Sequence, residues 1–180
     1  MRLVDGAISM TMVLLALAGC KPSAVTPAAP AVSEAAGYLD HAQPRLRTLK
    51  LWLGAQELVT EIARSAVEVQ TGMMYRTEMG ENEAMLFVFP VPYRAQFYMR
   101  NTLLPLSCAY MDSNGVIREI HDMKPKDETS ITAATDDIQY VLETRQGWFQ
   151  RHHIGIGTVV RTERGSFAET FWGGRGDTVP

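Results

Sequence analysis

Most of the chain after residue 46 has the hydrophobic pattern of short β-strands. Over residues 49–53, leucines at every second position alternate with Lys and Trp, which is typical of a half-buried strand. A turn at residues 54–56 separates this segment from residues 58–63, which we expect to pair with it as a hairpin. The folded part of the chain is therefore predicted to begin with two antiparallel strands.

Later segments predict further strands. We expect them over residues 85–89, 96–101, 107–112, 116–121, 140–144 and 158–162. Residues 85–89 are apolar on both faces, which indicates a central strand, and Pro90 and Pro92 are expected to end it. A turn at residues 113–115 favours a hairpin between the strands on either side of it.

Two short helical segments complete the pattern. Ser65 and Glu68 have the spacing of a capping box, so a helix is expected over residues 66–71, with Gly72 as its stop. Residues 147–152 predict a helical turn. The sum is a mainly β (α+β) fold, either a small antiparallel barrel or a curved sheet, with one or two short helices.

The chain divides into a leader, a tether, one domain and a tail. Residues 46–163 have a suitable length for a single compact β-rich domain. Residues 164–180 are Gly-rich and are predicted to be a mobile tail. The formal net charge of −3 and the lack of a basic run argue against nucleic acid as a partner.

Residues 1–19 are predicted to be a lipoprotein signal peptide. Their apolar run is too short to span a membrane and suits the hydrophobic region of a cleaved leader. The closing residues Leu17-Ala18-Gly19-Cys20 resemble a bacterial lipobox, whose Cys is acylated and becomes the new N-terminus. An ordinary secretory leader followed by a chance Cys is the alternative interpretation.

Residues 20–45 are predicted to be the lipidated Cys20 and a flexible tether rich in Pro and Ala, because such composition buries little apolar area. Several acyl groups on Cys20 would anchor the chain stably to a membrane. Lipoproteins retained at the inner membrane resemble one another in carrying Asp directly after the lipidated Cys, whereas this chain has Lys21 there. We therefore expect an outer-membrane anchor, in a cell with two membranes, with the domain facing the periplasm.

The chain has two cysteines, and lipidation of Cys20 leaves Cys108 without a partner for an internal disulfide. Cys108 lies in an apolar run and is expected to be a small buried residue. The His residues show no ligand-like spacing, so no metal and no cofactor are expected.

The segment over residues 96–107 carries the most specific candidate chemistry. A predicted strand runs into a bend fixed by Pro105 and places Arg100, Asn101 and Thr102 beside an apolar core. Asn101 and Thr102 either satisfy backbone groups of the bend or form the polar floor of a ligand pocket with Arg100 at its rim.

Arg76 and Glu143 are the other candidates. The Arg76 guanidinium could bind a carboxylate or phosphate, or form a structural ion pair with Glu68 or Glu143. Glu143 interrupts an apolar strand, as a paired or perturbed carboxylate would. The capping box explains Glu68 without catalysis.

Three function classes follow. The leading one is a non-enzymatic envelope lipoprotein that binds an unknown small molecule or envelope protein in a cleft near Arg76, Arg100 and Asn101, with Thr102 and Glu143 as further candidates. The rival is an envelope enzyme of unassigned class that acts on a cell-envelope saccharide or peptide, with Glu143 or Asp112 as the acid/base. A structural assembly factor with a broad apolar patch is the third.

Several motifs together point to one family. They are Glu61-Ile62-Ala63, Gly72-Met73-Met74-Tyr75-Arg76, residues 85–89, residues 97–102 with Pro105-Leu106, Asp112 with Gly115, and Tyr140-Val141-Leu142-Glu143 with Gly147. In this order and spacing, residues 49–162 resemble the bacterial and archaeal domain of unknown function 192. The resemblance implies a compact β-rich fold, often exported or lipid-anchored, and no particular reaction. Ser107 and Ala84 depart from the Asp and Gly that many members carry there.

Overall fold

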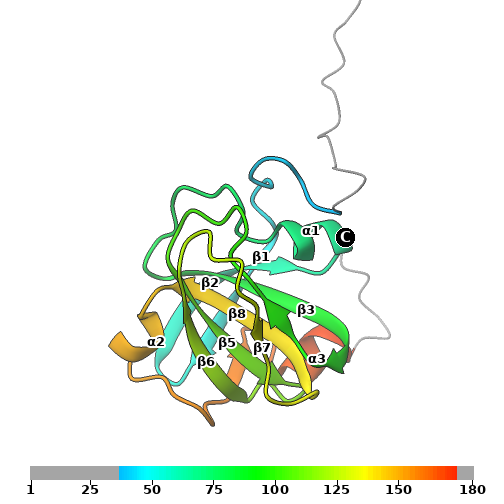
Figure 1. Ribbon diagram of the computed structural model, residues 1–180. Helices are drawn as coiled ribbons and strands as arrows, with labels where there is room; N and C mark the ends of the chain where they lie inside the picture. The colour runs from blue at the N-terminus through cyan, green and yellow to red at the C-terminus, as the bar shows by residue number, and fades with distance from the viewer. Residues whose placement is uncertain (1–36, 174–180) are drawn as a thin grey trace, which may run out of the picture.

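The computed structural model describes residues 37–173, and Figure 1 shows how they are arranged. The predicted signal peptide over residues 1–19, the lipidation of Cys20 and the end of the tail, residues 174–180, lie outside the described residues.

Seven strands form one curled sheet in the order β6-β5-β8-β3-β2-β1-β9. They are β1 (Thr48–Leu53), β2 (Gln56–Ala63), β3 (Glu83–Tyr93), β5 (Leu106–Asp112), β6 (Ile117–Met123), β8 (Ile138–Arg145) and β9 (Val160–Thr162). Only β2 and β3 pair in parallel; the other neighbours in this sheet are antiparallel. A bridge between Val116 and Val159 brings the two ends of the sheet together, so the sheet forms a half-barrel. The predicted fold class is confirmed.

The remaining elements are small. Strands β4 (Gln96–Phe97) and β7 (Ile131–Thr132) pair with each other outside the main sheet. The helices are α1 (Ala66–Thr71), α2 (Trp148–Arg151) and α3 (Phe167–Phe171). Helix α1 begins with the predicted capping box, in which Ser65 Oγ accepts from the Glu68 amide at 3.3 Å and Glu68 Oε2 accepts from the Ser65 amide at 2.8 Å. It ends at Gly72, whose φ of 47° favours glycine.

Two apolar clusters pack on opposite faces of the sheet. Leu51, Leu86 and Leu142 belong to the first cluster, to which α2 and α3 also contribute side chains. Phe87 and Val141 belong to the second. Because successive side chains of a strand point to opposite faces, the central strands β3, β5 and β8 must be apolar on both sides.

The second cluster is covered by α1, by the β4–β7 pair and by the chain between β4 and β5. Val69 of α1, Phe97 of β4 and Ile131 of β7 all pack against it. In Figure 1, α1 lies above the sheet, and the blue segment that precedes β1 runs beside it. This cover creates the cavity described below.

Two predicted strands differ most from the structure in their bounds. Strand β3 continues through Pro90 and Pro92 to Tyr93, with a shift of register against β8 after Val88. Prolines are compatible with such an irregular strand end, where ladder hydrogen bonds are interrupted. The strand predicted over residues 96–101 covers only Gln96–Phe97, because the Thr102 amide donates to the Met99 carbonyl at 3.0 Å and turns the chain.

The last part of the predicted tether, residues 37–45, is packed on the domain. The Leu39 amide donates to Thr71 Oγ1 at 3.0 Å, and the Leu39 side chain is buried. Gln43 Nε2 donates to the Gly72 carbonyl at 2.8 Å. These contacts attach the segment to both the end of α1 and the residue that stops it, so the tether prediction is wrong for residues 37–45.

The prediction of a mobile tail is wrong for residues 164–173. They contain α3, which begins with a second capping box between Ser166 and Glu169. Phe167 is fully buried and stacks on Tyr140, with their ring centres 4.6 Å apart. The Gly-rich composition suggested mobility, whereas the buried ring of Phe167 holds this segment on the sheet.

Replacing the buried anchor of α3 should destabilise the whole domain. We expect Phe167→Ala to lower the free energy of unfolding by about 3–5 kcal/mol, because it removes a large buried ring and leaves a cavity. Ala168→Gly is the control on the exposed side of the same helix and should cost only about 1 kcal/mol. Urea denaturation measures both, and equal small losses would contradict the packing of α3.

Candidate functional site

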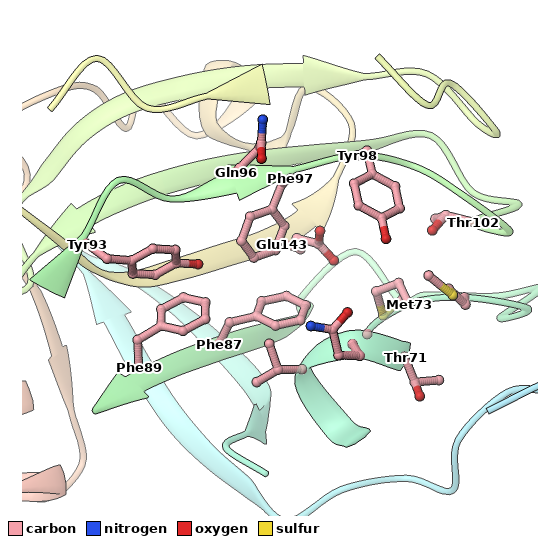
Figure 2. Close-up of a pocket in the computed structure, with 14 residues that line it drawn as sticks. Thr71, Met73, Phe87, Phe89, Tyr93, Gln96, Phe97, Tyr98, Thr102 and Glu143 are labelled. Carbon is pink, nitrogen blue, oxygen red and sulfur yellow. The ribbon is translucent and has the colours of Figure 1, made fainter. Parts of the chain in front are cut away.

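A cavity of about 170 Å³ lies between the second face of the sheet and its cover. Helix α1 and the three residues after it, strands β3 and β8, and the segment from Gln96 to Thr102 contribute its walls (Figure 2). The lining residues are Val69, Gln70, Thr71, Gly72, Met73, Met74, Phe87, Phe89, Tyr93, Gln96, Phe97, Tyr98, Thr102 and Glu143.

Glu143 is the only acidic or basic residue among them. It stands on β8 opposite Met85 of β3 and Cys108 of β5, two strands that pack tightly on either side. Its side chain shares the face of Val141, two positions before it, and therefore enters the second cluster. Figure 2 shows its carboxyl group between Phe97 and Tyr98, directed into the cavity.

Burial dominates the electrostatics of Glu143. Glu143 is 4% exposed, and its Oε2 atom has no hydrogen-bond partner in the described part of the chain. Removal from water disfavours the charged form, which raises the pKa of the Glu143 carboxyl from 4.5 to about 8. The carboxyl is therefore mostly protonated at neutral pH.

The titratable neighbours of Glu143 on β5 are neutral. Burial raises the pKa of the Cys108 thiol and that of the Tyr110 hydroxyl far above their ordinary values, and Glu143 adds to both shifts. Tyr110 Oη donates to the Ile131 carbonyl at 2.6 Å, which ties the cover to the sheet. Cys108 is a free, buried cysteine, as predicted.

Aromatic rings form the apolar walls. The ring centres of Phe87 and Phe97 are 5.0 Å apart at nearly right angles, and those of Phe89 and Tyr93 are 4.7 Å apart. Burial raises the pKa of Tyr93 to about 12, so its hydroxyl is neutral. Tyr98 closes the other end of the wall beside Thr102 (Figure 2).

Arg76 forms a buried structural ion pair, which was one of its two interpretations. Its partner is neither Glu68 nor Glu143. Its Nη1 and Nη2 atoms each lie 2.9 Å from one carboxylate oxygen of Glu61 on β2. Glu61 Oε2 also accepts from the Leu46 amide at 2.7 Å. This fork-like pair joins the loop after α1 to the sheet, so Arg76 has a structural partner and does not line the cavity.

Arg100 and Asn101 lie outside the cavity too. Arg100 Nη2 is 2.7 Å from the Glu128 carboxylate at the surface, and its guanidinium lies 5.2 Å from the ring centre of Tyr98. Asn101 has a left-handed φ of 54°, and its carbonyl accepts from the Tyr75 amide at 2.9 Å. Its side-chain Nδ2 donates to Met74 Sδ at 3.9 Å, so both the backbone and the side chain of Asn101 bond the loop after α1.

The structure thus divides the predicted site residues. Arg76, Arg100 and Asn101 do not converge on the cavity, because each is engaged by a different local partner. Thr102 and Glu143 do line it, and Thr102 is buried. The predicted cleft contained two guanidinium groups and an amide, whereas the structure has an aromatic cavity with one carboxyl group.

Asp112, the other proposed acid/base, supports a turn. Its Oδ1 accepts from the amides of Asn114 and Val116 at 2.9 and 3.0 Å, and its Oδ2 pairs with Arg118 at 2.7 Å. It does not line the cavity. Ser107, at one of the departures from the family pattern, donates to Asp122 and accepts from the Gly147 amide at 2.8 Å.

Within residues 37–173, no group of three or more His, Cys, Asp or Glu side chains could hold a metal ion. The same residues contain no helix long and apolar enough to cross a membrane.

Sequence reasoning missed the aromatic walls. Phe87 and Phe89 were predicted to be core residues of a central strand, whereas they also face the cavity. A signal was present on β8, where Val141 and Glu143 share one face: an acidic residue there must meet whatever covers that face. The cover itself comes from distant segments and has no local signature.

The fold and the cavity together define a small, mainly β domain with an aromatic, singly acidic cavity. Residues 50–162 match the family DUF192, described as an uncharacterized ACR, and the chain belongs to this family. No curated protein matches the sequence significantly.

The similar solved structures include two bacterial proteins. A protein of unknown function from Novosphingobium aromaticivorans DSM 12444 is 32% identical with a TM-score of 0.62, and the match covers 79% of this chain and 99% of that one. A protein from Sinorhizobium meliloti 1021, described as a "putative transcription regulator", is 29% identical with a TM-score of 0.60; the match covers 64% and 92% of the two chains. They bear out the small β fold.

The raised pKa of Glu143 predicts a specific pH dependence of stability. The folded pKa, about 8, exceeds the unfolded value of 4.5, so the folded state holds this proton more tightly. The contribution of this proton to the free energy of unfolding is fully present below pH 4.5 and is lost as the pH rises towards 8. Each unit of pKa difference corresponds to about 1.4 kcal/mol, so the expected loss is a few kcal/mol.

Glu143→Gln, which cannot titrate, should lack this loss. Urea denaturation at pH 5 and pH 8 should show the wild-type protein losing stability relative to the variant. Parallel stability curves for the two proteins would mean that the Glu143 carboxyl has an ordinary pKa.

Proposed function

We propose that this protein is an exported, lipid-anchored binding protein of the cell envelope, and that it holds a small organic molecule in the Glu143 cavity. The single observation that carries the binding proposal is the carboxyl oxygen Oε2 of Glu143, buried without a hydrogen-bond partner at a cavity wall. Buried polar atoms are almost always paired, so an orphaned one beside a cavity suggests a missing partner.

The cost of this arrangement supports the same conclusion. A neutral carboxyl group buried without its full set of hydrogen bonds costs about 1–3 kcal/mol, and an apolar residue on β8 would avoid that cost. Such local departures from good packing are typical of functional sites. Figure 2 places the carboxyl where a ligand between Phe97 and Tyr98 would reach it.

Retention of a natural ligand tests the binding proposal. Val69 of α1 lines the cavity, whereas Val67 on the same helix is similarly half-buried and does not. Val69→Phe should fill the cavity and reduce the retained small molecule at least tenfold, and Val67→Phe should leave it unchanged. Native mass spectrometry of the full chain, taken from its own envelope, measures both. Equal retention in the two variants would contradict the proposed site.

The anchor is proposed from the leader and Cys20, which offer the lipobox pattern before a Pro- and Ala-rich stretch. Lys21 favours the outer membrane, with the domain facing the periplasm. The packed segment over residues 37–45 would then connect the tether directly to α1 beside the cavity.

Metabolic labelling with a fatty-acid analogue tests the anchor. Cys20→Ser should abolish labelling and release the protein from the membrane fraction. Cys108→Ala is the matched control, because the chain has two cysteines and Cys108 is buried in the sheet. Labelling that survives Cys20→Ser would contradict lipidation at Cys20.

A second candidate is an envelope enzyme that acts on a saccharide or peptide, with Glu143 as a general acid. The raised pKa of Glu143, about 8, favours this candidate, because a carboxyl protonated at neutral pH can donate a proton. No second carboxylate lines the cavity in the described part of the chain, so a two-carboxylate mechanism has no support there. Under this alternative, the molecule retained by Glu143→Gln would be a substrate, and the wild-type protein would convert it.

A further inference from the structure

We infer that the occupant of the cavity is a compact organic cation, such as a primary amine on a small apolar body. Its ammonium N–H donates to Oε2 of Glu143, and its body lies against the rings of Phe87, Phe97 and Tyr98. This inference rests on the proposed binding function and names the ligand class for that site.

The charges at the cavity disfavour an anion. No Lys, Arg or His is among its lining residues, and the guanidinium groups of Arg76 and Arg100 are paired with Glu61 and Glu128. An anionic ligand would therefore meet an acidic side chain with no positive group to offset it. An ammonium group is favoured, because its positive charge stabilises the ionised form of the Glu143 carboxyl.

The walls favour a cation over a neutral molecule of the same shape. Aromatic rings attract a cation at their faces, and the attraction is strongest where water is excluded. Phe87, Phe89, Phe97, Tyr93 and Tyr98 supply five such rings around one carboxyl group. Carboxylate plus aromatic rings is the combination that recognises ammonium groups, with the carboxylate fixing direction and the rings fixing size.

The volume limits the ligand. A cavity of about 150 Å³ binds benzene, and this one has about 170 Å³. A phenyl ring with an aminomethyl group is thus of suitable size.

Binding of an ammonium group must move a proton. The Glu143 carboxyl is protonated at pH 7 in the free protein. The titratable groups that face it are Cys108 and Tyr110 from β5, Tyr93 at the end of β3 and Tyr98 after β4, and α1 contributes no titratable residue to the lining. Burial raises the pKa values of Cys108, Tyr110 and Tyr93, which are neutral at pH 7. When the ammonium enters, Glu143 loses its proton to solvent and the pair is neutral overall. Up to one proton is released for each ligand bound.

Three phenyl probes of similar size and different charge test the ligand class: benzylamine, benzyl alcohol and benzoate. Isothermal titration calorimetry of the full chain at pH 7, in two buffers of different ionisation enthalpy, gives affinity and proton release together. We expect benzylamine to bind at least tenfold more tightly than benzyl alcohol, with release approaching one proton. Benzoate should not bind.

Two variants separate Glu143 from general electrostatics. Glu143→Gln keeps the shape of the side chain and should lower benzylamine affinity at least tenfold and abolish proton release. Asp136→Asn removes one negative charge at an exposed position outside the cavity and should change neither value. The urea denaturation of Glu143→Gln at pH 5 shows that this variant is folded.

The outcomes distinguish this inference from the proposed function. Equal affinity for benzylamine and benzyl alcohol, or binding of benzoate, overturns the assignment of a cation while the cavity remains a binding site. Failure of all three probes also overturns the cation assignment. The proposed function is judged separately, by the retention of the natural ligand in Val67→Phe and its loss in Val69→Phe.

Discussion

The candidate site depends on the burial of the Glu143 carboxyl between two flanking strands on a face of the sheet that is itself covered. On an open face, the same residue would be solvated and charged. Because β3 and β5 pair with β8 on either side, the carboxyl cannot move to solvent along the sheet. Burial makes it a neutral acid, and the space left by the cover makes it accessible to a small molecule.

Several independent contacts hold the cover that produces this burial. The Arg76–Glu61 pair fixes the loop after α1, and the segment over residues 37–45 binds the end of that helix. Tyr110 binds the β7 backbone from the sheet side. The arginines that suggested a binding cleft thus position the walls instead. Arg100, stacked on Tyr98, has a comparable role at the opposite rim.

Periodicity predicted the sheet well, because alternation along 49–53 and the capping box at Ser65 are local signals. It failed where the outcome depended on distant contacts. The helix around Phe167 was not predicted, because it is held by a contact with the distant Tyr140. Glu143 was selected as perturbed because it interrupts an apolar strand, whereas its aromatic surroundings come from segments more than forty residues away in sequence.

The protonation state of Glu143 can be measured directly. Carbon-13 NMR of the side-chain carboxyl carbon, in protein labelled at glutamate, follows each carboxyl group through a pH titration, and Glu143→Gln identifies the resonance. A buried, unpaired acid predicts a midpoint near 8. A midpoint near 4.5, the ordinary value for a solvated glutamate, would contradict both the burial and the site built on it.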